Sequence, residues 1–448
     1  MANMENDSQK MDKIISLSKQ RGFVYPGSEI YGGLQNAWDF GPLGVELKKN
    51  IKDEWWNRFV RRRGDMTGVE TALIMNTKVW EASGHISNFT DPLSECEKCH
   101  KRFRTDHLED AKKCPECGGN LLEAKQFNLM LTTHLGASED KASEAYFRPE
   151  TAQGMFVDFK NVLESSRRRL PFGIAQTGKA FRNEITPGNY IFRTREFEQM
   201  EIEYFINVPQ TDSEWEAEFE KWRIDMREWI RHIGIRDEDI YELNVSKEDL
   251  AHYSKKTIDF EYKFPFGQKE LYGLAYRTDF DLKNHGEKSG ENIKYRDPIS
   301  GEEFYPHVIE PTFGVERTVL AAMCSAYTEE EVGGEEGEKE TRVVMKFPKW
   351  LAPVKAAILP LSKKEELTLP AKALADDLRK EFTVEYDETQ SIGKRYRRQD
   401  EIGTPFCITF DFDSLNDKKV TVRDRDTMIQ ERIAIVDLCD YLRKELSK

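Results

Sequence analysis

The sequence has 448 residues, a formal net charge of −14 and a hydrophobic fraction of 38%. This length is too great for one compact core and predicts two or three domains. Charged residues make up 33% of the chain, which is typical of a well-solvated globular surface. No apolar run reaches the roughly 18 residues that a membrane-spanning helix needs. The polar start MANMENDSQK is unlike a secretory signal, so we expect a cytoplasmic protein.

The negative charge argues against a nucleic-acid partner, because phosphate binding favours a basic surface. Its distribution weakens that argument, since residues 351–448 hold 18 Lys and Arg against 19 Asp and Glu. Part of the acidity belongs to the run at residues 329–338. We expect residues 328–340 to form a solvated acidic loop without chemistry of its own.

A long amphipathic helix is predicted from Pro42, because proline suits the first helical turn. Apolar residues recur at every fourth position, and the basic run Arg61-Arg62-Arg63 followed by Gly64 predicts its end. The repeating residues are Leu43, Leu47, Ile51, Trp55 and Phe59. The pattern is compatible with packing against the chain's own domain or against another copy.

Cysteines form two C-x2-C pairs separated by 14 residues: Cys96, Cys99, Cys114 and Cys117. This spacing predicts a structural zinc site in an insertion spanning about residues 90–122. Disulfides are the alternative, but thiols stay reduced in the cytosol. Four thiolates leave no open coordination position, so we expect no catalysis at this metal.

Charged and aromatic residues alternate through residues 181–205, which read FRNEITPGNYIFRTREFEQMEIEYF. The alternation predicts an antiparallel strand pair with its turn at residues 186–189. One strand face then carries Arg193, Arg195, Phe197, Gln199, Glu201 and Glu203. Arginine forks suit phosphate oxygens, a carboxylate accepts from an amine and a phenyl ring stacks on a base, so this face predicts a nucleotide site. The alternative is a half-exposed strand pair in which Arg and Glu only neutralise each other.

Two further stretches place charged residues at helix starts. Glu150 lies in the words RPETAQG, and Arg317 ends the words IEPTFGVER. A helix start favours anions, so Arg317 and the helix could hold a phosphate together, although pairing of Arg317 with Glu316 explains the local sequence equally well. Between them, residues 207–263 are predicted to form a helical insertion, because three tryptophans recur at seven-residue spacing.

After residue 349 the pattern predicts alternating strands and helices. The predicted strands are residues 354–359, 382–386, 406–410 and 420–423, and the predicted helices are residues 365–380, 392–403 and 427–446. Such alternation is typical of a three-layer α/β domain. The run KRYRR at residues 394–398 suits a nucleic-acid backbone and a stacked base, or else forms an ordinary solvated helix face.

Six of these stretches, in this order, resemble the class II aminoacyl-tRNA synthetases, and specifically their homodimeric, glycine-specific members. The matching stretches are the helix after Gly41-Pro42 (motif 1), RPETAQG, residues 181–201 (motif 2), RTDFDL, IEPTFGVER (motif 3) and SIGKRYRRQDEIGTPFC. The resemblance implies an α+β catalytic domain built on an antiparallel sheet over residues 1–348. It also implies an α/β anticodon-binding domain over residues 349–448, and a homodimer interface that includes the motif 1 helix.

The resemblance further implies that ATP and Mg²⁺ activate glycine to glycyl-adenylate, and that glycine is then transferred to the 3' end of tRNA, with zinc as a structural ion. Arg182 would hold the α-phosphate, while Arg193 and Arg317 would hold the β- and γ-phosphates. Glu184 would accept from the adenine amine, and Phe197 would stack on adenine. Among these, Arg182 and Arg317 would be the catalytic residues.

The glycine site implied by the resemblance consists of Glu150, Glu201, Arg277, Glu310 and Thr312. Thr312 replaces the serine that the family usually carries. Two other classes are compatible with parts of the sequence: a non-catalytic synthetase-like accessory subunit, and an RNA-binding protein with a zinc ribbon. The complete set of ATP-binding residue types argues against the accessory subunit.

Overall fold

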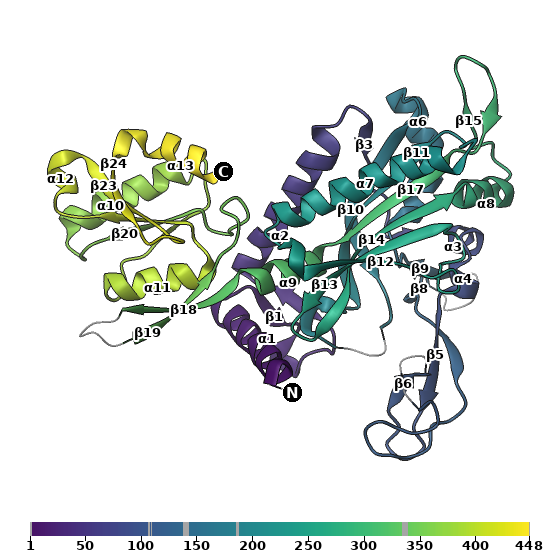
Figure 1. Cartoon of the computed structure of the whole chain (residues 1–448), viewed down its shortest axis with the longest axis horizontal. Coiled ribbons are helices and arrows are strands. Elements are labelled where there is room, and N and C mark those ends of the chain that lie inside the picture. Colours follow the sequence, from purple (N-terminus) through teal and green to yellow (C-terminus); the bar gives the residue numbers. More distant parts are fainter. Residues whose placement is uncertain are drawn as a thin grey trace.

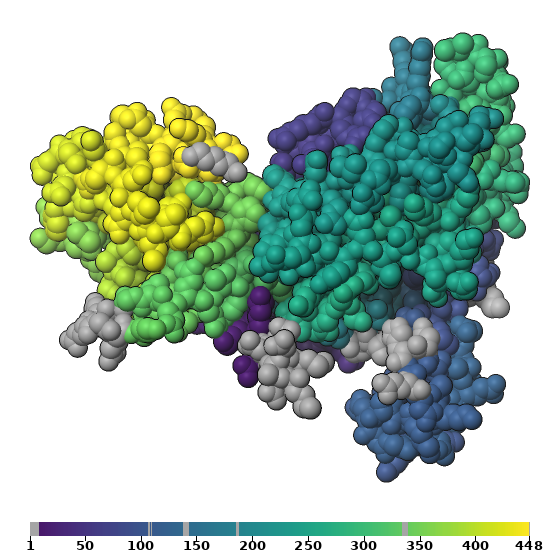
Figure 2. Space-filling model, viewed as in Figure 1, coloured from purple at the N-terminus to yellow at the C-terminus, as the bar shows by residue number. Residues whose placement is uncertain are grey.

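The computed structural model describes residues 2–105, 108, 110–137, 143–184, 188–333 and 339–447. Figure 1 shows a large N-terminal body, a smaller C-terminal body drawn in yellow, and a finger carrying β5 and β6 that projects from the large body. In the space-filling view of Figure 2, the C-terminal body is a separate mass that joins the large one through the light-green segment. No helix in the described ranges has the length and apolar character that a membrane span requires.

A seven-stranded sheet organises the large body, in the order β12-β13-β14-β17-β11-β10-β3. The strands are β3 (Met66–Gly68), β10 (Phe172–Phe181), β11 (Glu196–Ile206), β12 (Ile240–Asn244), β13 (Lys256–Phe264), β14 (Gly267–Thr278) and β17 (His307–Gly314). Only β3 pairs in parallel, with β10, and the other pairs are antiparallel. The predicted antiparallel sheet is therefore present.

Long helices cover one face of this sheet. They are α1 (Ala2–Arg21), α2 (Pro42–Trp56), which continues as a π-helical turn at Asn57–Arg61, α7 (Asp212–His232) and α9 (Val315–Ala326). The predicted apolar stripe of α2 is buried in the core that these helices share with the sheet. Packing against the chain's own domain thus accounts for the amphipathic pattern of α2.

Shorter helices lie elsewhere in the large body: α3 (Thr77–Ala82), α4 (His85–Asn88), α5 (Ala152–Val157), α6 (Phe159–Ser166) and α8 (Phe280–Ser289). Of these, α5 packs on β10 and β11. Residues Met200, Ile202 and Tyr204 of β11 belong to the core with α2, α7 and α9, whereas Phe205 belongs to a second core with α5. Because side chains alternate along a strand, the odd-numbered residues of β11 face the α5 side.

Small sheets complete this body. Strands β1 (Val24–Pro26) and β2 (Trp38–Phe40) pair near α2, β4 (Ile74–Met75), β8 (Thr132–His134) and β9 (Glu144–Phe147) form a three-stranded sheet, and β15 (Tyr295–Arg296) pairs with β16 (Glu303–Phe304). The projecting finger contains β5 (Thr90–Glu95), β6 (Arg102–Arg104) and β7 (Lys125–Asn128) in the order β6-β5-β7.

The segment predicted as a helical insertion is helical only through α7. Residues further along form β12 and β13, which are strands of the central sheet. The three tryptophans of α7 are buried in the main core, and the indole nitrogen of Trp229 donates to the Tyr272 hydroxyl at 3.2 Å. The seven-residue spacing therefore marks a helix that packs on the sheet of its own domain.

The predicted acidic loop is also different in the structure. Residues on both sides of the segment 334–338, which lies outside the described residues, form the hairpin strands β18 (Tyr327–Gly333) and β19 (Lys339–Met345). Glu330 forms ion pairs with Arg342 and Lys346, and Lys339 pairs with Glu331. Cross-strand cations thus allow an acidic run to form a strand.

The C-terminal body is a five-stranded sheet in the order β21-β20-β22-β23-β24 with helices around it. Its elements are β20 (Ala356–Pro360), α10 (Glu365–Leu378), β21 (Val384–Tyr386), α11 (Ile392–Ile402), β22 (Phe406–Phe410), α12 (Ser414–Asp417), β23 (Lys419–Asp424), β24 (Gln430–Ala434) and α13 (Leu438–Leu446). The predicted helix over residues 427–446 is wrong in its first part, because β24 pairs with β23 there.

The basic run on α11 is largely occupied by contacts within the protein. Buried Arg395 donates to the Pro360 carbonyl at 2.7 Å, Arg397 pairs with Glu340 at 3.0 Å, and Arg398 pairs with Asp387. The Tyr396 hydroxyl is hydrogen-bonded to Thr409. The arginines of this run thus bind carbonyl and carboxylate oxygens of neighbouring elements, while Lys394 is exposed.

Candidate active site

A cavity of about 380 Å³ opens over the central sheet on the odd-numbered side of β11. Nine of the predicted site residues line it: Glu150, Arg182, Glu184, Arg193, Phe197, Glu201, Glu310, Thr312 and Arg317. They come from the segment before α5, the segment between β10 and β11, the strands β11 and β17 themselves, and the first turn of α9. The turn proposed between Arg182 and Arg193 lies partly outside the described residues, but Gly188 and Arg193 form an antiparallel bridge.

One end of the cavity is rich in arginine. The guanidinium of Arg182 lies 5.2 Å from the ring centre of Phe197, and its Nε donates to the Pro149 carbonyl at 3.0 Å. Arg193 Nε lies 3.9 Å from a Glu184 carboxylate oxygen. Cations, a carboxylate and an aromatic ring therefore line the same end, which is the donor and acceptor set that a nucleotide requires.

Arg317 projects from the third position of α9 into this end. Its Nη1 lies 3.0 Å from Glu270 Oε2, and its guanidinium lies 4.4 Å from the ring centre of Phe192. The charge of Arg317 lowers the pKa of Glu270. Glu316 instead pairs with Lys48 and accepts from the Glu198 amide, so the alternative pairing of Arg317 with its chain neighbour is not what the structure contains.

The opposite end of the cavity is acidic. Glu150 precedes α5 and is buried, with Oε2 3.2 Å from His85 Nε2 and Oε1 accepting from Gln153 at 3.0 Å. Burial would raise the pKa of Glu150, but the combined effects of His85, Arg277 and Gln153 lower that pKa well below its ordinary value. His85 is in turn hydrogen-bonded to Ser83 at 2.8 Å.

Glu201 faces Glu150 from β11. It accepts hydrogen bonds from the Thr151 hydroxyl and, at 2.9 Å, from the Thr312 hydroxyl. Burial and the charge of Glu150 raise its pKa. The hydroxyl of Thr312 therefore serves to orient a carboxylate, which is a role that its extra methyl group does not prevent.

Arg277 lies beneath this end and does not line the cavity. Its side chain is 1% exposed, donates to Glu310 at 2.7 Å and makes a fork with Asp281 at 2.7 and 2.8 Å. The ring of Tyr253 covers the guanidinium, with its centre 3.7 Å from Cζ. Arg277 was predicted to contact the substrate. In the structure it instead contacts Glu310, the carboxylate that faces the cavity.

Sequence patterns missed several residues that build this end, including His85, Gln153, Tyr253 and Asp281. The pairing of Asp281 with Arg277 could have been predicted, because the two residues are four positions apart where a strand passes into a helix. Gln153 lies within RPETAQG, three residues after Glu150, whereas His85 and Tyr253 come from distant segments without a periodic pattern. In the opposite sense, Arg195 was predicted on the site face, yet it donates to the Gln35 carbonyl at 2.8 Å and does not line the cavity.

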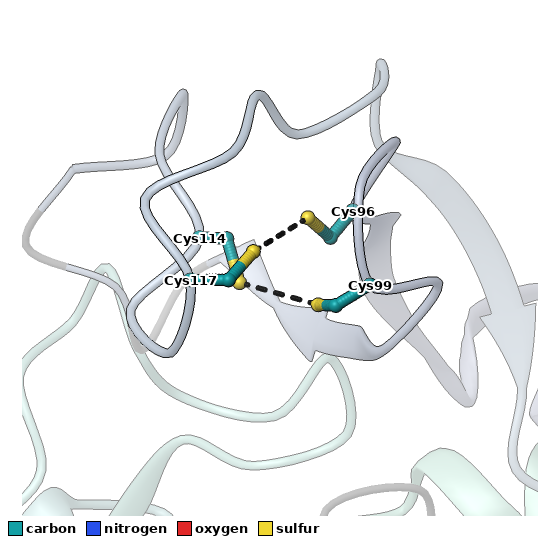
Figure 3. Close-up of side chains that lie close together, drawn as sticks. All are labelled: Cys96, Cys99, Cys114 and Cys117. Carbon is teal, nitrogen blue, oxygen red and sulfur yellow. Dashed lines mark hydrogen bonds between the residues drawn. The ribbon is translucent and has the colours of Figure 1, made fainter.

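The finger brings its cysteines together, as Figure 3 shows. The Sγ atoms of Cys96 and Cys117 are 3.5 Å apart, those of Cys99 and Cys114 are 3.7 Å apart, and all lie within 4.8 Å of one another. A zinc ion with Zn–S bonds of about 2.3 Å needs sulfurs about 3.8 Å apart. All the cysteines are free thiols, so the donor set and spacing fit a tetrahedral thiolate site.

Comparisons with known proteins agree with this architecture. Residues 135–326 match the tRNA synthetase class II core domain (G, H, P, S and T), and residues 355–445 match the anticodon binding domain. The chain is 52% identical to the glycine–tRNA ligase of Caldanaerobacter subterraneus subsp. tengcongensis, over 97% of this chain and 98% of that protein. The chain belongs to the glycine–tRNA ligase family.

Other members of the family align equally completely. The glycine–tRNA ligase of Alkaliphilus oremlandii is 52% identical over 97% of this chain and 98% of its own length. That of Thermobifida fusca is 51% identical over 99% of this chain and 100% of its own length. The class II core and the anticodon-binding domain expected from the resemblance are therefore confirmed.

Proposed function

We propose that this chain activates glycine with ATP and transfers it to the 3' end of its tRNA. The main support for the proposal is that one cavity combines arginines and an aromatic ring at one end with buried carboxylates at the other. Family membership supports it independently. A non-catalytic accessory subunit or an RNA-binding protein with a zinc ribbon would not explain why one cavity has both an arginine-rich end and an acidic end.

In the first step, a carboxylate oxygen of glycine attacks the α-phosphorus of ATP, and the bond from that phosphorus to the pyrophosphate oxygen breaks. No side chain serves as a nucleophile. The protein instead aligns the reactants and offsets charge on the phosphates. In the second step, a hydroxyl of the tRNA's terminal adenosine attacks the glycyl carbonyl, and AMP leaves.

At the arginine end, Arg182 would contact the α-phosphate, and Arg193 and Arg317 the β- and γ-phosphates. Phe197 and Glu184 would receive the adenine ring and its amine. Binding of phosphate by Arg317 would replace its ion pair with Glu270. Bound Mg²⁺ would offset phosphate charge, and Glu270, beside Arg317, is a cavity carboxylate that would help to hold it.

At the acidic end, the glycine ammonium would meet Glu150, Glu201 and Glu310, and its carboxylate would point toward the phosphates. Thr312 and Arg277 would orient the carboxylates, as their hydrogen bonds to Glu201 and Glu310 support. Glycine offers few other groups to bind, so charge-assisted hydrogen bonds supply the affinity and the cavity wall excludes side chains.

We also propose that the four cysteine thiolates hold one structural zinc, that the C-terminal body contacts tRNA and that the chain is a homodimer. The first is supported by the sulfur spacing and the second by the anticodon-binding match. The third is supported by uncovered apolar side chains between β1 and β2, where Ile30 is 88% and Tyr31 is 87% exposed. Sedimentation equilibrium tests the third, and a monomer over the whole concentration range would contradict it.

ATP–pyrophosphate exchange with each amino acid in separate reactions tests the function. We expect exchange with glycine and at least about tenfold less with alanine, the next larger side chain. Charging of tRNA with labelled glycine tests the transfer step. Absence of glycine-dependent exchange, or stronger exchange with another amino acid, would refute the proposal.

A further inference from the structure

Glu203 is a buried acid behind the acidic end of the cavity. It follows Glu201 by two residues on β11 and therefore points to the same side of the sheet. Its side chain is 0% exposed, and neither of its carboxylate oxygens has a hydrogen-bond partner among the described residues. It does not line the cavity, so it lies beneath the residues that do.

Two carboxylates of the glycine end are its close neighbours. Oxygens of Glu201, Glu203 and Glu310 all lie within 4.8 Å of one another. Arg277, whose positive charge acts on Glu203, directs its side-chain hydrogen bonds to Glu310 and Asp281. The residue paired with Glu203 on β10 is the apolar Ile174.

The charged groups around Glu203 are thus mainly negative. Glu201 lies on its own strand, Glu310 on β17 and Asp281 on α8, and Arg277 on β14 is the neighbouring positive charge. An unpaired buried carboxylate is costly, and closely spaced carboxylates do not all ionise. Burial, followed by the charge of Glu310, raises the pKa of Glu203 well above its ordinary value.

We propose that Glu203 is a positioning residue of the glycine pocket, held as a neutral carboxylic acid whose hydroxyl donates to Glu201 or Glu310. The proposal rests on the proposed function and adds a residue that acts through the ammonium-binding carboxylates. A neutral donor below the pocket has two effects. It adds no negative charge beside Glu201 and Glu310, and it fixes their oxygens toward the substrate.

Paired substitutions separate this role from a simple charge or space-filling role. Glu203→Gln keeps the shape of the side chain and a hydrogen-bond donor, but it removes the ionisable carboxyl group. We therefore expect a KM for glycine within about threefold of wild type. Glu203→Leu removes the donor, so we expect that KM to rise at least about tenfold with the KM for ATP unchanged. Glu310→Gln is the comparison, because it removes a charge that faces the cavity.

Infrared difference spectroscopy of the full-length protein measures the proton directly. We expect a carbonyl band of a protonated carboxyl group that persists at about pH 8, well above the ordinary pKa of about 4.3 for glutamate. The band should be lost in Glu203→Gln and in Glu203→Leu, and either variant suffices if the other fails to fold. This readout needs neither glycine nor ATP.

Three outcomes would overturn the proposal: no such band in wild type, a band that persists in the folded variants, or a rise in the glycine KM of Glu203→Gln as large as that of Glu310→Gln. Failure of wild-type protein to exchange pyrophosphate with glycine would refute the proposed function instead. The infrared result would then still report whether Glu203 holds a proton.

Discussion

Replacement of Arg317 by alanine tests the proposed phosphate site. In the structure its guanidinium has an ion pair with Glu270 and a cation–π contact with Phe192, and the side chain is 23% exposed. Such partly exposed contacts contribute about 1 kcal/mol each to folding. A charge-stabilising contact in a transition state is worth about 3 kcal/mol, which corresponds to about a hundredfold in rate.

We therefore expect Arg317→Ala, and equally Arg182→Ala, to reduce pyrophosphate exchange at least about a hundredfold while the protein stays folded. The assay is exchange at saturating glycine over a range of ATP concentrations, together with thermal unfolding. Arg195→Ala is the matched control. It removes a guanidinium from the same strand pair as Arg182, but this guanidinium lies outside the cavity. Near-normal exchange in both folded site variants would show that the phosphates bind elsewhere.

Protein purified without chelator should contain one zinc per chain, and Cys96→Ser should lose it and impair tRNA charging more than adenylate formation; absence of metal in wild type would contradict this. Glu150→Gln or Glu310→Gln should raise the KM for glycine at least about tenfold with little change for ATP, and an unchanged glycine dependence would exclude the carboxylate pocket. Burial raises the pKa of Asp259, which lines the cavity, to about 7. Asp259 is neutral below that pH and negative above it, so the KM for ATP should rise between about pH 6 and about pH 8, and a persistent rise in Asp259→Asn would assign it to another group. Hydrolysis of mischarged alanyl-tRNA should be undetectable, because steric exclusion already rejects larger side chains.

The alternation of residues along β11 was sufficient to predict its two faces. Phe197, Gln199 and Glu201 line the cavity, as a period of two requires. The same rule failed for Arg195, which precedes the first residue of the strand, Glu196. A periodic pattern is informative only where the backbone is regular.

Residues that act through other residues were harder to find. His85 orients Glu150 from a four-residue helix distant in sequence, and no local pattern indicates that contact. Charge runs were misleading for a related reason. The acidic run that begins in β18 was expected to stay solvated, yet Arg342 and Lys339 of β19 form ion pairs with its first residues. Whether like charges are tolerated depends on partners that only the fold brings into register.

The two ends of the cavity share the same strands, and under the proposed function this would explain how one sheet aligns two substrates. Phe197 and Glu201 are separated by four residues of β11, which is about 13 Å along a strand and comparable to the reach of an extended aminoacyl nucleotide. Strand β11 is hydrogen-bonded on both sides, to β10 and to β17, so that spacing is fixed. The register between β11 and β17 also sets Glu201 opposite Thr312 and Gln199 opposite Gly314, immediately before the helix that carries Arg317. Under the proposed function, the carboxylate for the ammonium and the arginine for the phosphate are positioned by one strand register, so the backbone would determine the geometry in which glycine and ATP meet.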